Sequence, residues 1–132
     1  GDGIVIRTGQ LNHPNGACGY RIEFAGKSIA ICTDTEHYEG RIDENVVELA
    51  KEADVMVYDS AYTPEEYPKF KGWGHSTWEE AIKVAEEADV KQTFLFHHDP
   101  SHNDEKMDEI AKEAAAVREG VRPAIEGEEI EL

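Results

Sequence analysis

The stretch Asp54-Val-Met-Val-Tyr-Asp-Ser-Ala-Tyr62 decides the fold of this chain. Its centre, Val55–Tyr58, is a short apolar run, as expected for a central strand that is buried on both faces. Immediately upstream, Asp43 precedes apolar residues at the spacing of one helix face, which predicts a capped helix that ends near Ala53. A helix followed by a buried strand indicates an α/β arrangement.

Three further strands are expected before this unit. Residues 4–11 are rich in β-forming residues, and residues 18–25 alternate, with Tyr20, Ile22 and Phe24 on one face. The turn Ala25-Gly26-Lys27 joins the second strand to a third at residues 28–33, which predicts a hairpin.

Helix and strand alternate again after the central strand. Ser76-x-x-Glu79 is a capping box that opens a second helix, Thr93–Phe96 is a short buried strand, and Asp104–Arg118 is a third helix. The acidic tail Ile125–Leu132 is expected to add an edge strand. The order β-β-β-α-β-α-β-α-β predicts a single α/β (α+β) domain over residues 1–132, a mixed sheet covered by helices on at least one face.

The composition limits the classes of partner. The formal net charge is −16, which repels phosphate backbones and anionic membranes, so nucleic acid is not expected to bind this chain alone, and no membrane partner is expected. With 39% hydrophobic residues, no membrane-length apolar run and no signal-peptide pattern, a folded cytoplasmic protein is predicted. Cys18 and Cys32 are expected to be buried free thiols, with a disulfide as the alternative.

Metal-competent side chains follow three consecutive strands of the predicted sheet. Asp34 follows the strand at residues 28–33, Asp59 follows Val55–Tyr58, and His97 follows Thr93–Phe96. Loops at the carboxyl ends of strands in an α/β sheet converge on a shared crevice, where ligands bind. His13 and His75 lie in loops that contain glycine and proline. Imidazole and carboxylate together suit Zn²⁺, Mn²⁺ or Fe, so we predict a metal site.

Each of these residues also has an ordinary structural explanation. Asp34 could close an Asx turn, Asp59 could end its strand, and His97 could be a hydrogen-bonded histidine at a strand end. His13 precedes Pro14 in what could be a simple turn, and His75 could be a loop residue before the helix cap. Elsewhere, His37 and His102 are expected to be exposed to solvent, and Trp73 and Trp78 to lie in the core.

Five motifs, in a fixed order, carry a family resemblance. They are His13-Pro-Asn-Gly-Ala-Cys-Gly-Tyr20, Ile31-Cys-Thr-Asp34-Thr-Glu36, Tyr58-Asp-Ser-Ala-Tyr62, Gly72-Trp-Gly-His75-Ser-Thr77 and Phe96-His-His-Asp-Pro100. Over roughly residues 4–104 the chain resembles the C-terminal half of the metallo-β-lactamase-fold hydrolases, in the branch that looks like tRNase Z and the cyclic phosphodiesterases. The resemblance implies half of an αββα sandwich whose two halves bury a metal pair at their shared edge.

The resemblance also implies a role for each matching residue. His13, Asp34 and His97 resemble the family's metal ligands, with Asp34 as the carboxylate that bridges two divalent ions (Zn, Mn or Fe). His75 resembles the loop histidine that tRNase Z-like enzymes place beside the scissile phosphate, and Asp59 resembles the acidic residue that supports it. His98 takes a supporting or substrate-contacting role.

One family feature does not occur in the sequence. The His-x-His-x-Asp-His cluster, which supplies most ligands of the first metal, is missing, and neither Asp34-Thr-Glu-His37 nor His97-His-Asp-Pro-Ser-His102 has its spacing. The expected partner is therefore an N-terminal half that carries this cluster, or a second copy of the chain. The parent protein is predicted to hydrolyse a small phosphodiester or related ester, and this chain alone is expected to be inactive.

Two other functions compete with this interpretation. The chain could be a non-catalytic half-domain that dimerises, or binds a partner, through the apolar surface that the first half would cover. It could also be a stand-alone α/β binding module with no metal role. The metal content of the purified chain separates these hypotheses.

Overall fold

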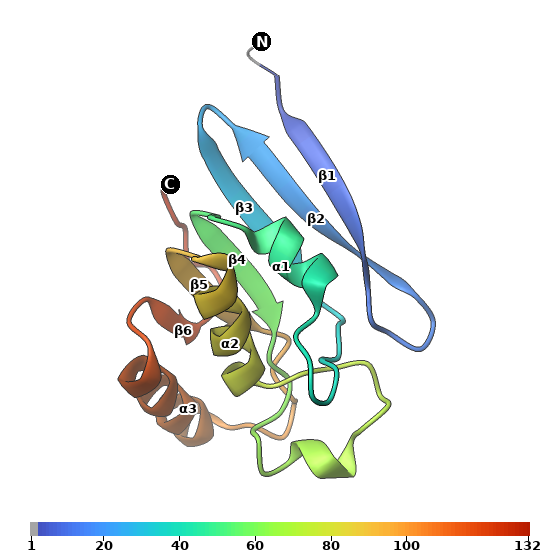
Figure 1. Ribbon diagram of the computed structural model, residues 1–132. Helices are drawn as coiled ribbons and strands as arrows, with labels where there is room; N and C mark the ends of the chain where they lie inside the picture. Colours follow the sequence, from blue (N-terminus) through green and yellow to red (C-terminus); the bar gives the residue numbers. More distant parts are fainter. Residues whose placement is uncertain (1–2) are drawn as a thin grey trace.

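Six strands form one sheet in which every strand pairs with its neighbours in the sequence (Figure 1). The computed structural model describes residues 3–132. The strands are β1 (Val5–Leu11), β2 (Ala17–Phe24), β3 (Lys27–Cys32), β4 (Val55–Asp59), β5 (Gln92–Phe96) and β6 (Val121–Pro123). The helices are α1 (Glu44–Ala50), α2 (Trp78–Ala88), α3 (Asp104–Val117) and the short 3₁₀ helix η1 (Tyr67–Lys69).

The sheet is mixed, as predicted. Strands β1, β2 and β3 are antiparallel, whereas β3, β4, β5 and β6 are parallel. The β2–β3 hairpin closes through Ala25 and Gly26, whose φ angles of 51° and 76° are those of a two-residue turn with two left-handed residues. Because β3, β4 and β5 run in the same direction, their carboxyl ends lie at one edge of the sheet, where Figure 1 shows the long connecting loops.

The helices cover one face of this sheet. Each parallel strand is connected to the next by a helix. Because these crossovers share one hand and the strand order advances in one direction, all three helices lie on the same side of the sheet. Side chains from the three helices and from alternate strand positions, among them Ala30, Met56, Tyr58 and Leu95, form the main core on that side. None of the helices within residues 3–132 has the length and apolar character that a membrane crossing requires.

The opposite face of the sheet is apolar; it is open along β2 and at the end of β5, whereas Val55 and Phe94 on the same face are buried. Tyr20, Ile22 and Phe24 alternate with Arg21 as predicted, but the helices pack on the Arg21 side, where its guanidinium donates to the carbonyl oxygens of Leu49 and Lys51 at the end of α1. On the open face Tyr20 is 43% exposed, Phe24 55% and Phe96 43%. The apolar stripe of β2 is therefore available to another layer of protein.

Two boundaries differ from the sequence predictions. Thr77, not Ser76, is the N-cap of α2, where its hydroxyl accepts from the Glu80 N–H at 3.2 Å. Ser76 is fully buried instead, because its hydroxyl lies 2.8 Å from His37 Nδ1 and accepts from the Tyr58 hydroxyl. The predicted edge strand at residues 125–132 is absent from the structure. The last strand of the sheet is β6, which pairs with β5 and ends before this tail begins.

Four exposure predictions also fail. The side chain of His102 is only 3% exposed because it pairs with Glu66, and that of His37 is 13% exposed beside Ser76. Trp73 is 63% exposed, whereas Trp78 lies in the core as predicted. Both cysteines are free, but only Cys32 is buried; Cys18 faces solvent near the edge strand β1.

Candidate metal centre

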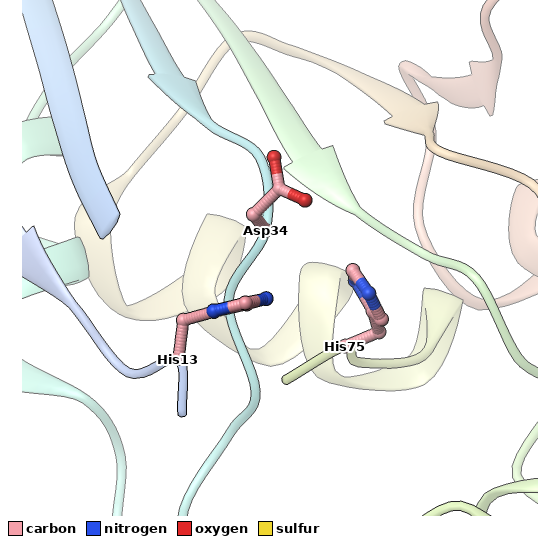
Figure 2. Close-up of side chains that lie close together, drawn as sticks. All are labelled: His13, Asp34 and His75. Atoms are coloured by element: carbon pink, nitrogen blue, oxygen red, sulfur yellow. The ribbon is translucent and has the colours of Figure 1, made fainter. Parts of the chain in front are cut away.

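The structure brings His13, Asp34, His75 and His97 together at the carboxyl edge of the sheet. His13 lies in the loop between β1 and β2, Asp34 follows β3, His75 lies in the loop before α2, and His97 follows β5. Figure 2 shows His13 and His75 on either side of Asp34, with their rings reaching into the space below it. One potential ligand atom from each of these three residues lies within 4.8 Å of the others.

His97 completes the cluster from the end of β5. Its Nε2 lies 3.6 Å from Asp34 Oδ1, and its ring stacks on the ring of His75 with centroids 4.4 Å apart. The ring centroids of His13 and His75 are 5.7 Å apart. The site therefore gathers three imidazoles and an exposed carboxylate from four different loops, and their roles as ligands stay predictions.

The backbone at two of these residues is unusual. Asp34 has φ 54° and His97 has φ 64°, both in the left-handed region that residues with a side chain rarely adopt. His97 directly follows β5 and Asp34 lies two residues after the end of β3, so this backbone turns each side chain out of the alternation of its strand. Such conformations cluster at functional sites, because the surrounding structure must hold them in place.

Asp59 supports His75 from beneath the site. Its side chain is fully buried, and Oδ2 accepts from His75 Nδ1 at 2.7 Å and from the Thr35 N–H at 3.2 Å. Oδ1 accepts from the N–H groups of Ala61 and Ser76. Burial raises the pKa of the Asp59 carboxyl, and the hydrogen bonds from His75 and Ser76 oppose that rise.

This arrangement fixes which nitrogen of His75 is free. A carboxylate can only accept, so the proton of His75 lies on Nδ1 and its Nε2 lone pair points away from Asp59. A carboxylate behind a histidine is the usual outer support of a metal-binding imidazole, because it fixes the ring orientation and raises its basicity. The hydrogen bond between Asp59 and His75 is therefore present, and the role of this pair in catalysis stays a prediction.

Sequence reasoning missed Glu36 and Gly74. The Glu36 carboxylate accepts from the N–H groups of Gly72 and Gly74 and from the Tyr67 hydroxyl. Burial alone raises the pKa of this carboxyl, but the hydrogen bonds from Gly72, Tyr67 and Gly74 outweigh it and hold the pKa below its usual value. The only signal in the sequence is the pair of glycines before His75, which does not reveal their partner.

His98 does not join the cluster. It lines a groove of about 600 Å³ between α3 and the segment after β6, with Met107, Arg122 and Ile125 among its neighbours. Burial lowers the pKa of its imidazole. A role for His98 beside the metal or the substrate therefore has no support in this geometry.

Comparison with known proteins accounts for this arrangement of loops. The family model described as the beta-lactamase superfamily domain matches residues 3–98. The chain belongs to the beta-lactamase superfamily. A ribonuclease Z from Brevibacillus brevis is 34% identical over 99 residues, which are 75% of this chain and 30% of that protein. The chain spans about a third of the length of the curated ribonuclease Z relatives that it matches.

Solved structures of the superfamily show the same fold. The metallo-beta-lactamase fold protein YhfI from Bacillus subtilis superimposes with a TM-score of 0.75 and 20% identity over 92% of this chain and 46% of its own. The short form of human tRNase Z gives a TM-score of 0.69 and 21% identity over 94% of this chain and 41% of its own. The mixed sheet with helices on one face is therefore a metallo-β-lactamase arrangement, as predicted.

The metallo-β-lactamase fold implies divalent metal ions, and the residues of this chain fit such ions. The imidazole and carboxylate donors are those that Zn²⁺, Mn²⁺ and Fe bind. Ligand atoms of His13, Asp34 and His75 already lie within 4.8 Å of one another, and those of Asp59, His75 and His97 do so as well. The supporting hydrogen bond from His75 to Asp59 is also in place.

Proposed function

We propose that this chain supplies the C-terminal half of a metal-dependent hydrolase site that acts on phosphodiester or related ester bonds. The observation that carries the proposal is the meeting of His13, Asp34, His75 and His97 at one edge of a metallo-β-lactamase sheet. The superfamily match and the relatives named ribonuclease Z, a name that refers to cleavage of an RNA phosphodiester, support it.

The proposed ligands are His13, Asp34 and His97, with Asp34 able to offer an oxygen to each of two ions. Zn²⁺ is the first candidate, and Mn²⁺ and Fe are the others, because one carboxylate among imidazoles suits all three. Divalent ions at such a site supply Lewis acidity and a nucleophile at neutral pH.

His75 and Asp59 act on the substrate side of this chemistry. Asp59 holds Nδ1 of His75, so Nε2 faces the cluster. When Nε2 also carries a proton, the imidazolium can donate a hydrogen bond to a phosphoryl oxygen or pass that proton to the leaving oxygen. The side chain of His75 is 17% exposed, which leaves it accessible from the site while its ring is held in place.

The open face of the sheet supports the proposal that a second layer completes the site. Tyr20, Phe24 and Phe96 are exposed on this face, and exposed apolar patches of this kind mark interaction surfaces. The solved relatives are about twice as long as the region that matches this chain. We propose that the covering layer is an N-terminal half that carries the missing histidine cluster, from the same protein or a partner chain.

Metal analysis and complementation test this proposal. The purified chain is first freed of metal and titrated with Zn²⁺ and Mn²⁺ by calorimetry; less than about 0.1 bound ion per chain at saturation would contradict retained metal binding. An N-terminal half from a relative is then added, and hydrolysis of bis(p-nitrophenyl) phosphate is measured. Stimulated hydrolysis that is lost in Asp34→Asn is the expected result, and no hydrolysis with a bound partner would contradict the enzymatic function.

The open face also favours a second candidate, a non-catalytic chain that pairs with itself. Edge strand β1 and the exposed Tyr20 and Phe24 offer both backbone and apolar contacts to another copy. Light scattering over a range of concentrations gives the oligomeric state. A dimer that is lost in Tyr20→Ser/Phe24→Ser, together with no metal uptake, would favour this candidate over the hydrolase.

A further inference from the structure

Glu36 connects the three loops that carry His13, Asp34 and His75. It lies two residues after Asp34, and its side chain is nine-tenths buried. Its N–H donates to the Asn12 carbonyl oxygen at 2.8 Å, and its own carbonyl oxygen accepts from Asn12 Nδ2 at 3.0 Å. These backbone contacts tie the segment after β3 to the residue that precedes His13.

The carboxylate of Glu36 reaches the third loop. Oε1 accepts from the N–H groups of Gly72 at 3.0 Å and Gly74 at 2.9 Å. Oε2 accepts from the same Gly72 N–H at 2.9 Å and from the Tyr67 hydroxyl at 2.5 Å. Hydrogen bonds to a buried charged group are stronger than those between neutral groups. We call these contacts to Tyr67, Gly72 and Gly74 the Glu36 clamp.

The Glu36 clamp holds the loop against the ring of His13. Gly74 has φ 94°, and a Cβ at this position would lie 2.4 Å from His13 Cδ2 and 2.8 Å from His13 Nε2. The backbone of Gly74 is therefore one wall of the space that the His13 ring occupies. The next residue is His75, whose Nδ1 is bound to Asp59.

A second carboxylate from the segment after β3 also reaches this loop, but its contact is much weaker. Lys71, on the same loop, pairs with Glu39, but both side chains are more than half exposed. Solvent-exposed ion pairs contribute little, because water screens them and both side chains lose freedom. Of the two carboxylates that reach the loop from the segment after β3, the buried one is therefore expected to determine its position.

We propose that Glu36 is a positioning residue: by holding Gly72 and Gly74, it sets the mutual placement of the His13 and His75 rings on either side of Asp34. The inference rests on the proposed function for its purpose, since those two rings are a proposed ligand and a proposed substrate contact. Its structural content, the placement of the rings, can be measured with no metal and no substrate.

The decisive experiment is NMR on the metal-free chain and on Glu36→Gln and Glu36→Ala, with Glu39→Gln as the matched control. In the wild type we expect protected N–H groups at Gly72 and Gly74 and nuclear Overhauser contacts between the Gly74 Hα and the His13 ring. Glu36→Ala removes every acceptor, so exchange at both N–H groups should rise about tenfold or more. The Overhauser contact should disappear, while the signals of β3, β4 and β5 persist.

Glu36→Gln distinguishes the charge from the shape. It keeps one acceptor oxygen but turns an NH₂ group toward Tyr67 and the Gly72 N–H, so intermediate exchange is expected, and Glu39→Gln should match the wild type. Unchanged exchange and an unchanged Gly74–His13 contact in Glu36→Ala would overturn the proposal. If Glu36→Ala does not fold, the proposal is decided by Glu36→Gln and Tyr67→Phe, each of which removes only part of the Glu36 clamp and should raise the exchange at Gly72 and Gly74 to an intermediate rate.

Calorimetric titration with Zn²⁺ separates this inference from the proposed function. If the wild type binds Zn²⁺, Glu36→Gln and Glu36→Ala should weaken binding by about 10–100-fold, as changes to outer supports of a metal site do. Zn²⁺ binding that stays equal in all three proteins while the Gly74–His13 contact is lost would overturn the positioning role. A wild type that binds no Zn²⁺ contradicts the proposed function, and the NMR result then decides the placement of the rings by itself.

Discussion

Replacing Asp59 with asparagine should change the tautomer of His75. In the wild type each carboxylate oxygen of Asp59 accepts two donors, and all of them are N–H groups. Asparagine has one acceptor oxygen and one NH₂ group. If its oxygen faces the N–H groups of Ala61 and Ser76, its NH₂ group faces Thr35 and His75 Nδ1. The proton of His75 must then move to Nε2, so that Nδ1 can accept.

The energetic cost follows from the same contacts. The Thr35 N–H loses its acceptor in a fully buried place, which costs about 1–3 kcal/mol. The charge-assisted bond to His75 becomes a neutral one, which costs about 1 kcal/mol more. Asp59→Asn should therefore lower the free energy of unfolding by about 2–4 kcal/mol.

Urea denaturation and the ¹⁵N shifts of the His75 ring test both parts of this reasoning. Asp99→Asn is the control, since Asp99 lies beside the site but its side chain accepts only from Ser101 on the surface. That change should cost less than about 1 kcal/mol and leave the His75 tautomer as it is. A His75 ring that keeps its proton on Nδ1 in Asp59→Asn, with stability within about 0.5 kcal/mol of wild type, would refute the argument.

Three further predictions concern the same loops. Gly74→Ala should destabilise the fold by about 1–3 kcal/mol more than Gly72→Ala in urea denaturation, because both glycines have positive φ but only Gly74 contacts His13; equal costs would contradict that contact. His97→Gly should be as stable as the wild type or more stable by up to about 1 kcal/mol, because φ 64° suits glycine, whereas His97→Ala should be less stable than His97→Gly. Both variants should lose metal binding. Burial lowers the pKa of His37 below its usual value of about 6.5, so the unfolded chain binds the proton more readily. The stability that neutral His37 contributes is complete above about pH 6.5 and is lost as the pH falls toward the depressed pKa. The free energy of unfolding, measured by urea denaturation from about pH 7.5 to 5.5, should therefore fall with pH less steeply in His37→Gln than in the wild type.

The strands and the candidate ligands could be predicted because their signals are local. The alternation in β2, the apolar run in β4 and the N-cap at Asp43 are properties of short segments, and the structure has each of them where expected. Asp34 and His97 could be placed at one edge because parallel strands bring their carboxyl ends together. The short spacing from strand end to ligand left little freedom for another arrangement.

The failures have the opposite character, since each depends on a partner far away in the sequence. Ser76 fits a capping box by spacing, but Tyr58 and His37 bind its hydroxyl in the core, so the helix begins one residue later at the Thr77 cap. His102 looks like a surface residue until Glu66, 36 residues earlier, folds back onto it. No local pattern distinguishes these residues from exposed ones.

The supporting residues of this site are more complete than its ligands. Asp59 has four donors and Glu36 has three, all from within this chain, and both carboxylates are nine-tenths buried or more. The side chains of Asp34 and His97, by contrast, are 46% and 42% exposed and make only a loose contact with each other. Burying a carboxylate is costly unless hydrogen bonds compensate it, and the donors of this chain do so for both groups. In the proposed assembly, this side of the site is therefore already in place, and addition of the proposed second layer should supply ligands without rearranging these loops.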